Sequence, residues 1–205
     1  GASGERHVDG SALGKTRALV EMGMPPRGTK DTPGYTDLPA FSPLLFVGNE
    51  VAAAHGSFDA VLSAVVPRDA TGALAPHLTT HELHFEDGQG SETAEEIEVA
   101  RACMFAGAAS VAEAVGAGKR TLVHCSWGQN RSSVICCAYA IIHRGIGADE
   151  AITHVRARNL ACRHYWGQQP PGGAMHNAVF CELLRELERG DDGRRAGARG
   201  DRCSR

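Results

Sequence analysis

The sequence predicts a single α/β domain with a largely parallel sheet, and two observations support this class. Between residues 43 and 188, short apolar runs of strand length alternate with longer segments of helical periodicity, as in proteins whose helices cover a parallel sheet. The 205 residues are 42% apolar, so the chain can bury one sizeable core but hardly two. The same apolar content excludes a chain that is disordered throughout.

Four strands are expected, at residues 44–47, 60–66, 80–85 and 120–124. The first is closed by Gly48 and Asn49 and the second by Pro67, which are residue types that favour turns. The third alternates loosely between polar and apolar side chains. Because each of the last two strands is followed by a helical segment, the connections favour parallel pairing.

Four helices are expected as well. The first begins at Thr93, which forms a capping box with Glu96, and it ends at the glycines of 116–118. The second begins after Gln129 and ends at Gly145. The last two cover residues 148–159 and 174–188. One face of the first helix carries the apolar residues Ile97, Met104, Ala108, Val111 and Val115.

The two flanks differ from this domain in composition. Residues 1–40 are rich in Gly, Pro and polar side chains and predict a flexible N-terminal arm, which leaves 41–188 as the folded domain. Residues 189–205 hold six Arg and three Asp, carry a net charge of +3, and are expected to be disordered. The whole chain has a net charge of −3, so the remainder carries −6. An acidic domain argues against nucleic-acid binding, which needs a basic surface.

Seven cysteines, an odd number without a C-x-x-C pair, indicate a reducing compartment. The cytoplasm is therefore the expected location, with the nucleus as the alternative. No group of Cys and His has the spacing of a zinc site, so neither a metal nor a cofactor is expected. The longest strongly apolar run, 134–142, is too short to cross a bilayer, and no membrane anchor is expected. The pattern indicates no particular oligomeric state.

The segment with most chemical information lies at the predicted junction between the strand at 120–124 and the helix after it. Cys125 and Arg131 are separated by five residues there. A strand-to-helix turn leaves backbone N–H groups unpaired at the positive end of the helix dipole, which is a binding site for phosphate. Gly128 allows close approach of an anion, and the planar fork of Arg131 can hold two phosphate oxygens. The residues expected to bind phosphate are Ser126, Trp127, Gly128, Gln129, Asn130 and Arg131.

The same environment favours the thiolate form of Cys125, because a helix N-terminus and a neighbouring cation stabilise the anion. Cys125 is therefore the expected nucleophile. Ser132 can donate its hydroxyl hydrogen to the sulfur and help it leave in the second half of a reaction. Asn130 tolerates left-handed backbone angles better than most residues, which suits a tight loop.

These residues resemble a known family. The pattern His124-Cys125-(X)5-Arg131-Ser132 resembles the signature of the cysteine-dependent protein tyrosine phosphatases. Residues 45–49 and 147–155 are similar to the opening strand and to the helix after the catalytic helix in its dual-specificity phosphatase branch. The resemblance covers about residues 43–188. It implies a central four- or five-stranded, mainly parallel sheet flanked by helices, and a protein phosphatase that forms a phospho-cysteine intermediate on phosphorylated protein substrates.

The resemblance also implies a general acid upstream of the nucleophile. Asp87 stands after the third predicted strand and is the candidate, with Glu86 as the alternative. A carboxylic acid there can give a proton to the leaving oxygen and later activate water. The stretch from Asp87 to Thr93 contains glycines and is expected to move as a lid.

Other functions stay open at this point. The Asn immediately before the Arg, Asn130, resembles the loop of the RNA 5′-triphosphatase subgroup. That subgroup resembles this family in fold and loop. A phosphoinositide substrate is a second alternative, although the loop offers no Lys for a polyanionic headgroup. A catalytically silent module that binds phosphorylated partners is the third.

Overall fold

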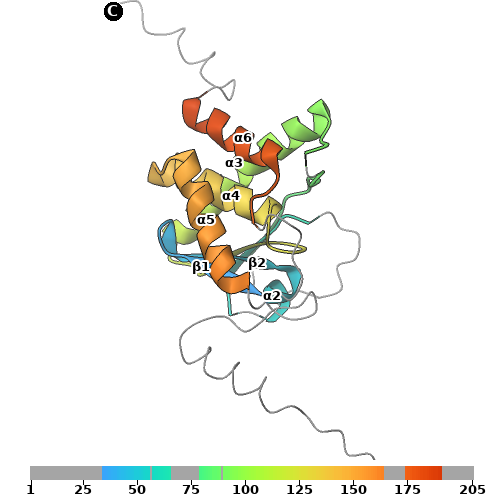
Figure 1. Ribbon diagram of the computed structural model, residues 1–205. Coiled ribbons are helices and arrows are strands. Elements are labelled where there is room, and N and C mark those ends of the chain that lie inside the picture. The colour runs from blue at the N-terminus through green and yellow to red at the C-terminus, as the bar shows by residue number, and fades with distance from the viewer. Residues whose placement is uncertain (1–33, 56, 66–78, 89, 164–173, 191–205) are drawn as a thin grey trace, which may run out of the picture.

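The computed structural model describes residues 34–55, 57–65, 79–88, 90–163 and 174–190. These residues form a five-stranded sheet flanked by helices (Figure 1). The strand order is β1-β2-β5-β3-β4, in which only β1 is antiparallel to its neighbour. This confirms the predicted fold class. The strands are β1 (Tyr35–Leu38), β2 (Ser42–Asn49), β3 (Ala60–Ser63), β4 (Thr79–Glu82) and β5 (Thr121–Cys125).

Four of the five described helices were predicted, and the short helix at Glu50–His55 was not. In chain order they are α2 (Glu50–His55), α3 (Ala94–Gly116), α4 (Arg131–Arg144), α5 (Ala148–Arg163) and α6 (Ala178–Arg189). The capping box of Thr93 and Glu96 is present at the start of α3, and Gly145 ends α4 in the left-handed conformation. The last helix begins at 178 rather than 174 because Asn177 caps it.

The two faces of the sheet carry different clusters of side chains, as the period of two along a strand requires. Leu45, Val47, Leu62 and Val123 point into the main core. Phe46, Val61 and Leu122 point to the opposite face. There they form a smaller cluster with Tyr35, Phe58 and two alanines of α2. The large helices therefore cover one face, and the short α2 covers the other.

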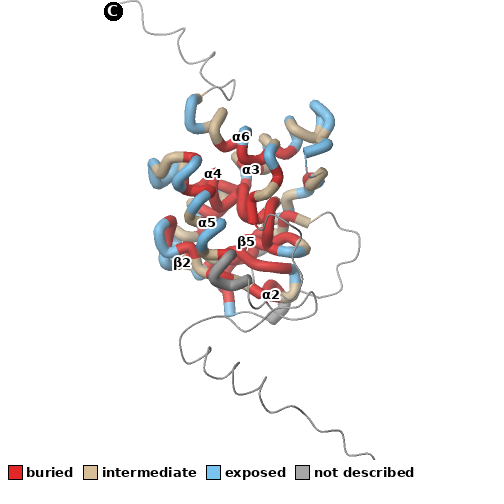
Figure 2. Tube along the Cα trace, viewed as in Figure 1, coloured by how far each residue is buried: buried red, intermediate tan, exposed pale blue. Residues whose placement is uncertain are grey.

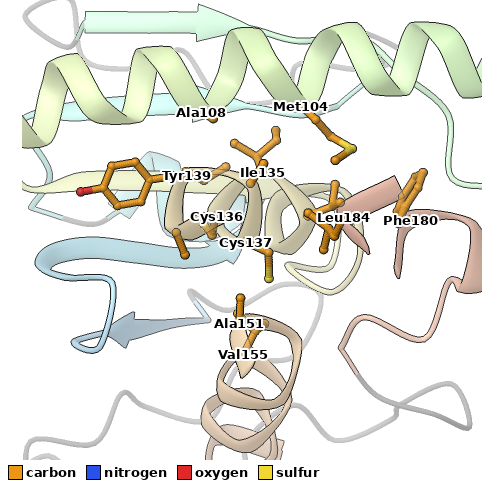
Figure 3. Packing of buried hydrophobic residues seen from close by; sticks show 14 of the residues in the cluster. Met104, Ala108, Ile135, Cys136, Cys137, Tyr139, Ala151, Val155, Phe180 and Leu184 are labelled. Carbon is orange, nitrogen blue, oxygen red and sulfur yellow. The ribbon is translucent and has the colours of Figure 1, made fainter. Parts of the chain in front are cut away.

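Helix α4 lies in the middle of the main core, between α3 and α5 and against α6 (Figure 3). Every residue from 132 to 140 is buried, so this helix is surrounded by other parts of the domain (Figure 2). Gly107 of α3 permits a close approach to α4, because a Cβ atom at this position would lie 2.7 Å from Cγ2 of Ile135. A rigid α4 fixes the loop that precedes it.

The predicted flexible arm is wrong at its C-terminal end, because Tyr35–Leu38 is strand β1 of the sheet. The neighbouring strand β2 explains why β1 can pair there. A Cβ atom at Gly48 of β2 would lie 2.8 Å from Cβ of Tyr35, so only glycine at this position allows β1 to approach β2 so closely. Phe41, in the turn after β1, is fully buried as well. Residues 1–33 of the expected arm and 191–205 of the expected tail lie outside the described residues.

By length and composition alone, α3 is the one helix in the described part of the chain that could cross a membrane. Such a criterion is also met by core helices of globular domains. The buried residues of α3, among them Met104, Ala108 and Val111, pack in the main core beside α4.

Candidate active site

The predicted phosphate-binding loop connects the C-terminal end of β5 to the first turn of α4. Cys125 is the last residue of β5 and is only 3% exposed. Its Sγ accepts a hydrogen bond from the backbone N–H of Gly128, at 3.2 Å, and one from the hydroxyl of Ser132, at 3.3 Å. Two donors therefore face the sulfur, one from the backbone and one from a side chain.

The backbone turns sharply at Gly128, whose φ of 67° lies in the left-handed region. Asn130 was expected to use such angles too, but it is right-handed, with φ −106° and ψ −65°. The prediction for Asn130 was wrong because its side chain, rather than its backbone, has the special role. The side-chain amide nitrogen of Asn159 in α5 lies 3.5 Å from the carbonyl oxygen of Gly128. This contact joins the loop to α5.

Arg131, the first residue of α4, folds back across the loop. One terminal nitrogen donates to the hydroxyl of Ser126 at 3.3 Å, and the other lies 3.5 Å from the carbonyl of Phe85. Its Nε–H is buried and has no partner among the described residues. The guanidinium thus joins the loop to the segment that carries the predicted acid.

Asp87 lies beside the loop, and two side-chain amides hold it there. The Nδ2 of Asn130 donates to one carboxylate oxygen at 3.0 Å, and the Nδ2 of Asn177 donates to the other at 2.9 Å. Glu86, the alternative, is exposed. The geometry therefore brings Asp87, rather than Glu86, into contact with the anion-binding loop.

The segment after Asp87, for which lid movement was expected, makes hydrogen bonds within itself and with the N-terminus of α6. Ser91 donates to the carbonyl of Gly88 through both its backbone N–H and its hydroxyl. Glu92 accepts from the N–H of Gly90 at 2.9 Å and from Asn177 at 2.5 Å. Movement of this segment stays a prediction.

Sequence reasoning missed the segment 174–177, which lies against the loop. The N–H of Met175 donates to the carbonyl of Gln129 at 3.1 Å, and the N–H of His176 donates to Asn130 Oδ1 at 3.0 Å. The carbonyl of Met175 in turn accepts from Arg156 of α5. The only available signal was the capping preference of Asn177 before an amphipathic helix, and that signal predicts a helix start and no contact with the site.

The remaining loop positions differ in exposure. Gln129 is buried, whereas Trp127 is 47% exposed. Trp127 was expected to be one of the phosphate-binding residues of the loop. Its exposure shows that the indole is not part of the hydrophobic core.

Burial shifts the pKa values of two side chains, those of His124 and Cys136. Burial lowers the pKa of His124 to about 4, because neither ring nitrogen has a hydrogen-bond partner, within the described part of the chain, that would stabilise the charged form. His124 is therefore neutral near neutral pH. Burial, with a smaller contribution from Cys125, raises the pKa of the Cys136 thiol well above its usual range. Cys136 is thus a packing residue rather than a second nucleophile.

No group of three or more metal-ligating side chains exists among the residues that the structure describes. The arrangement brings a thiol, a guanidinium and a carboxyl group together around one anion-binding loop.

A thiol at this strand-to-helix turn, with an arginine six residues later and a carboxylate held against the same loop, defines the class of cysteine-dependent phosphatases. The comparisons with known proteins agree. A family model for the catalytic domain of dual specificity phosphatases matches residues 53–171. Mouse (Mus musculus) dual specificity phosphatase 28 is 31% identical over 136 residues, which are 62% of this chain and 78% of that protein.

Solved structures of dual specificity phosphatases have the same fold as this chain. The crystal structure of human DUSP28 matches with a TM-score of 0.57 and 23% identity, covering 82% of this chain and 96% of that chain. A mouse putative dual specificity phosphatase, crystallised with zinc tungstate, matches with a TM-score of 0.53 and 26% identity, covering 80% and 91%.

The chain belongs to the dual specificity phosphatase family. It is a protein phosphatase, and therefore a hydrolase. The prediction of this activity from the sequence motif is confirmed. The comparisons do not favour the alternatives of an RNA 5′-triphosphatase, a phosphoinositide phosphatase or a silent binding module.

Proposed function

We propose that this phosphatase hydrolyses phosphorylated Tyr, Ser or Thr side chains through a phospho-cysteine at Cys125. The Sγ of Cys125 attacks phosphorus while the bond to the leaving oxygen breaks, and Asp87 gives that oxygen a proton. Asp87, now a carboxylate, then takes a proton from water. The water oxygen attacks phosphorus, the P–S bond breaks, and phosphate and the thiolate are released.

The observation that carries the proposal is the environment of the Cys125 sulfur. Gly128 N–H and the Ser132 hydroxyl both donate to it, at 3.2 and 3.3 Å, and both belong to the turn that begins α4. The unpartnered Nε–H of Arg131 supports binding of a phosphate oxygen beside that sulfur. The mouse neighbour was crystallised with zinc tungstate, and tungstate is, like phosphate, a tetrahedral oxyanion.

The decisive experiment compares Cys125→Ser with the wild type on an aryl phosphate. Turnover is expected to be lost while inorganic phosphate still binds, because the loop amides and Arg131 remain. Cys103→Ser is the matched control, since Cys103 lies on α3, where its thiol contacts the carbonyl of His84 at 3.8 Å rather than Cys125, and it should keep full activity. Retained turnover in Cys125→Ser would contradict the phospho-cysteine.

Substrate class and pH supply a second experiment. Phosphopeptides are expected to be turned over faster than triphosphate-ended RNA or phosphoinositide vesicles in one assay. Because the reaction needs a thiolate and a protonated acid together, its rate should follow a bell-shaped pH profile. Faster turnover of the RNA or the lipid would overturn the assignment to phosphoproteins.

The proposed location is the cytoplasm, with the nucleus as the alternative. The five described cysteines are all free thiols, which supports a reducing compartment. Imaging of a fluorescent fusion tests this, and a signal in the secretory pathway would contradict it.

A further inference from the structure

Asp87 is held by groups that lie far from it in the sequence. Its own segment supplies no hydrogen bond to the carboxylate among the contacts of the described residues. One oxygen accepts from Asn130 and the other from Asn177, which follows it by ninety positions. We propose that Asn177 is a positioning residue for Asp87, which anchors the carboxyl group to the N-terminus of α6; this inference rests on the proposed role of Asp87 as the acid.

The direction in which the Asn177 amide points is fixed by the backbone of α6. Its Oδ1 accepts from the N–H groups of Val179, at 3.0 Å, and Phe180, at 3.3 Å, as the cap of the helix. The Nδ2 must therefore face away from the helix, where it meets Asp87 at 2.9 Å and Glu92 at 2.5 Å. Both hydrogens and both acceptor sites of this amide are used.

The anchor is rigid because Asn177 is fully buried. The helix that it caps carries Phe180 and Leu184, both completely buried in the main core (Figure 3). The backbone N–H of Asn177 also lies 3.4 Å from Oδ1 of Asn130. The carboxyl group of Asp87 is thereby fixed relative to the loop that binds the phosphoryl group, which is what a proton donor requires.

Holding the carboxyl group in this way leaves it able to carry a proton. Each oxygen has two lone pairs, and each accepts one amide hydrogen here. One lone pair per oxygen remains for the proton that goes to the leaving group. The amides therefore orient Asp87 without occupying the site of proton transfer.

The test is Asn177→Ser, which keeps the helix cap and removes the amide donor. Its kcat is expected to fall roughly 10- to 100-fold on phenyl phosphate, whose poor leaving group needs the proton. On 2,4-dinitrophenyl phosphate, whose leaving group needs little protonation, kcat should stay close to that of the wild type. A role confined to stability would lower both rates alike, and that result would overturn the inference.

Leu187→Ala is the matched control. Leu187 lies on α6 and is partly buried against the core, so its truncation loosens the helix without touching the amide. This variant should lower the melting temperature and leave the ratio of the two rates unchanged. A change in that ratio equal to the one in Asn177→Ser would show that helix stability alone is responsible, and would overturn the inference.

A double variant separates this inference from the proposed function. Asp87→Asn should itself lose activity on phenyl phosphate, and adding Asn177→Ser should then cause no further loss. If Asp87→Asn keeps full activity, the proposed acid is wrong. If Asp87→Asn loses activity but Asn177→Ser does not, only the positioning role is wrong.

Discussion

Ser132 contacts the sulfur that has to leave phosphorus in the second step. Its hydroxyl donates to Cys125 Sγ at 3.3 Å from within the first turn of α4. Ser132→Ala should slow release of the thiolate by roughly 10- to 100-fold, the effect of a hydrogen bond to a charged group. Formation of the phospho-enzyme should be much less affected, so a burst of product is expected in rapid-quench experiments.

Ser133→Ala is the neighbouring control for this prediction. The hydroxyl of Ser133 is buried and has no partner among the described residues, so its removal should leave the steady-state rate unchanged. A uniform slowing of both steps in Ser132→Ala, without a burst, would contradict the assigned role.

His124 makes the stability of the domain depend on pH. Burial holds its pKa at about 4, against 6.5 for an exposed imidazole, so the unfolded chain binds the proton more tightly. The contribution of His124 to the free energy of unfolding is therefore fully present above pH 6.5, and it decreases as the pH falls towards 4. The total loss from this residue is about 3 kcal/mol, from the difference between the two pKa values.

Urea unfolding at pH 7 and pH 4.5 measures this effect. His124→Asn should show a smaller loss of stability between the two pH values than the wild type. The exposed His143 is the control, and His143→Asn should retain the wild-type dependence. An unchanged pH dependence in His124→Asn would show that other groups are responsible.

At the residue scale, the sequence predicted the groups whose roles are local. Cys125, Arg131 and Ser132 lie within eight positions of one another, so one strand-to-helix turn determines where they meet. Asn177 was not predicted, because its contact with Asp87 joins segments ninety positions apart and depends on how α6 packs. Nothing in the local sequence around Asn177 distinguishes a helix cap that also binds an acid from an ordinary one.

At the scale of elements, the approach of α3 to α4 depends on a glycine. Gly107→Ala would place a Cβ atom 2.7 Å from Ile135, so a neighbour must shift. Overpacking costs about 1–3 kcal/mol, and the better helix propensity of alanine returns about 1 kcal/mol. A net loss of stability is expected from denaturant unfolding.

Gly116→Ala, in the same helix, is the control for that prediction. No heavy atom lies within 4 Å of a Cβ atom built there, so alanine should leave stability unchanged or raise it slightly. If the two variants behave alike, the close contact between α3 and α4 does not limit the packing.

Elements with their own start and stop signals were predicted well. Thr93 and Glu96 start α3 and Gly145 ends α4 as expected, because capping acts between residues a few positions apart. Strand β1 was missed because four residues with a polar pattern carry too little signal. Its stability comes from Gly48 and from aromatic contacts of Tyr35 with Phe46 and Phe58.

At the scale of the whole molecule, β1 and the turn after it complete the core. Leu38 and Phe41 are both fully buried in the main cluster. A chain that begins at Ser42 loses both, and each large apolar side chain contributes about 2–5 kcal/mol. Its melting temperature should therefore lie far below that of a chain that begins at Gly34.

The comparison of these two truncated chains by calorimetry tests whether β1 belongs to the folding unit. Equal melting temperatures would mean that β1 is an accessory strand. The boundary at residue 41 predicted from composition would then be the better description of the domain.

The tie between Asp87 and Asn177 also couples the proton donor to the integrity of the core. The helix that Asn177 caps contributes Phe180 and Leu184 to the main cluster, so the same element that holds the acid completes the domain. Because a domain folds as a unit, a chain cut before residue 177 should lose its folded state and all turnover together, including turnover of esters with readily departing groups.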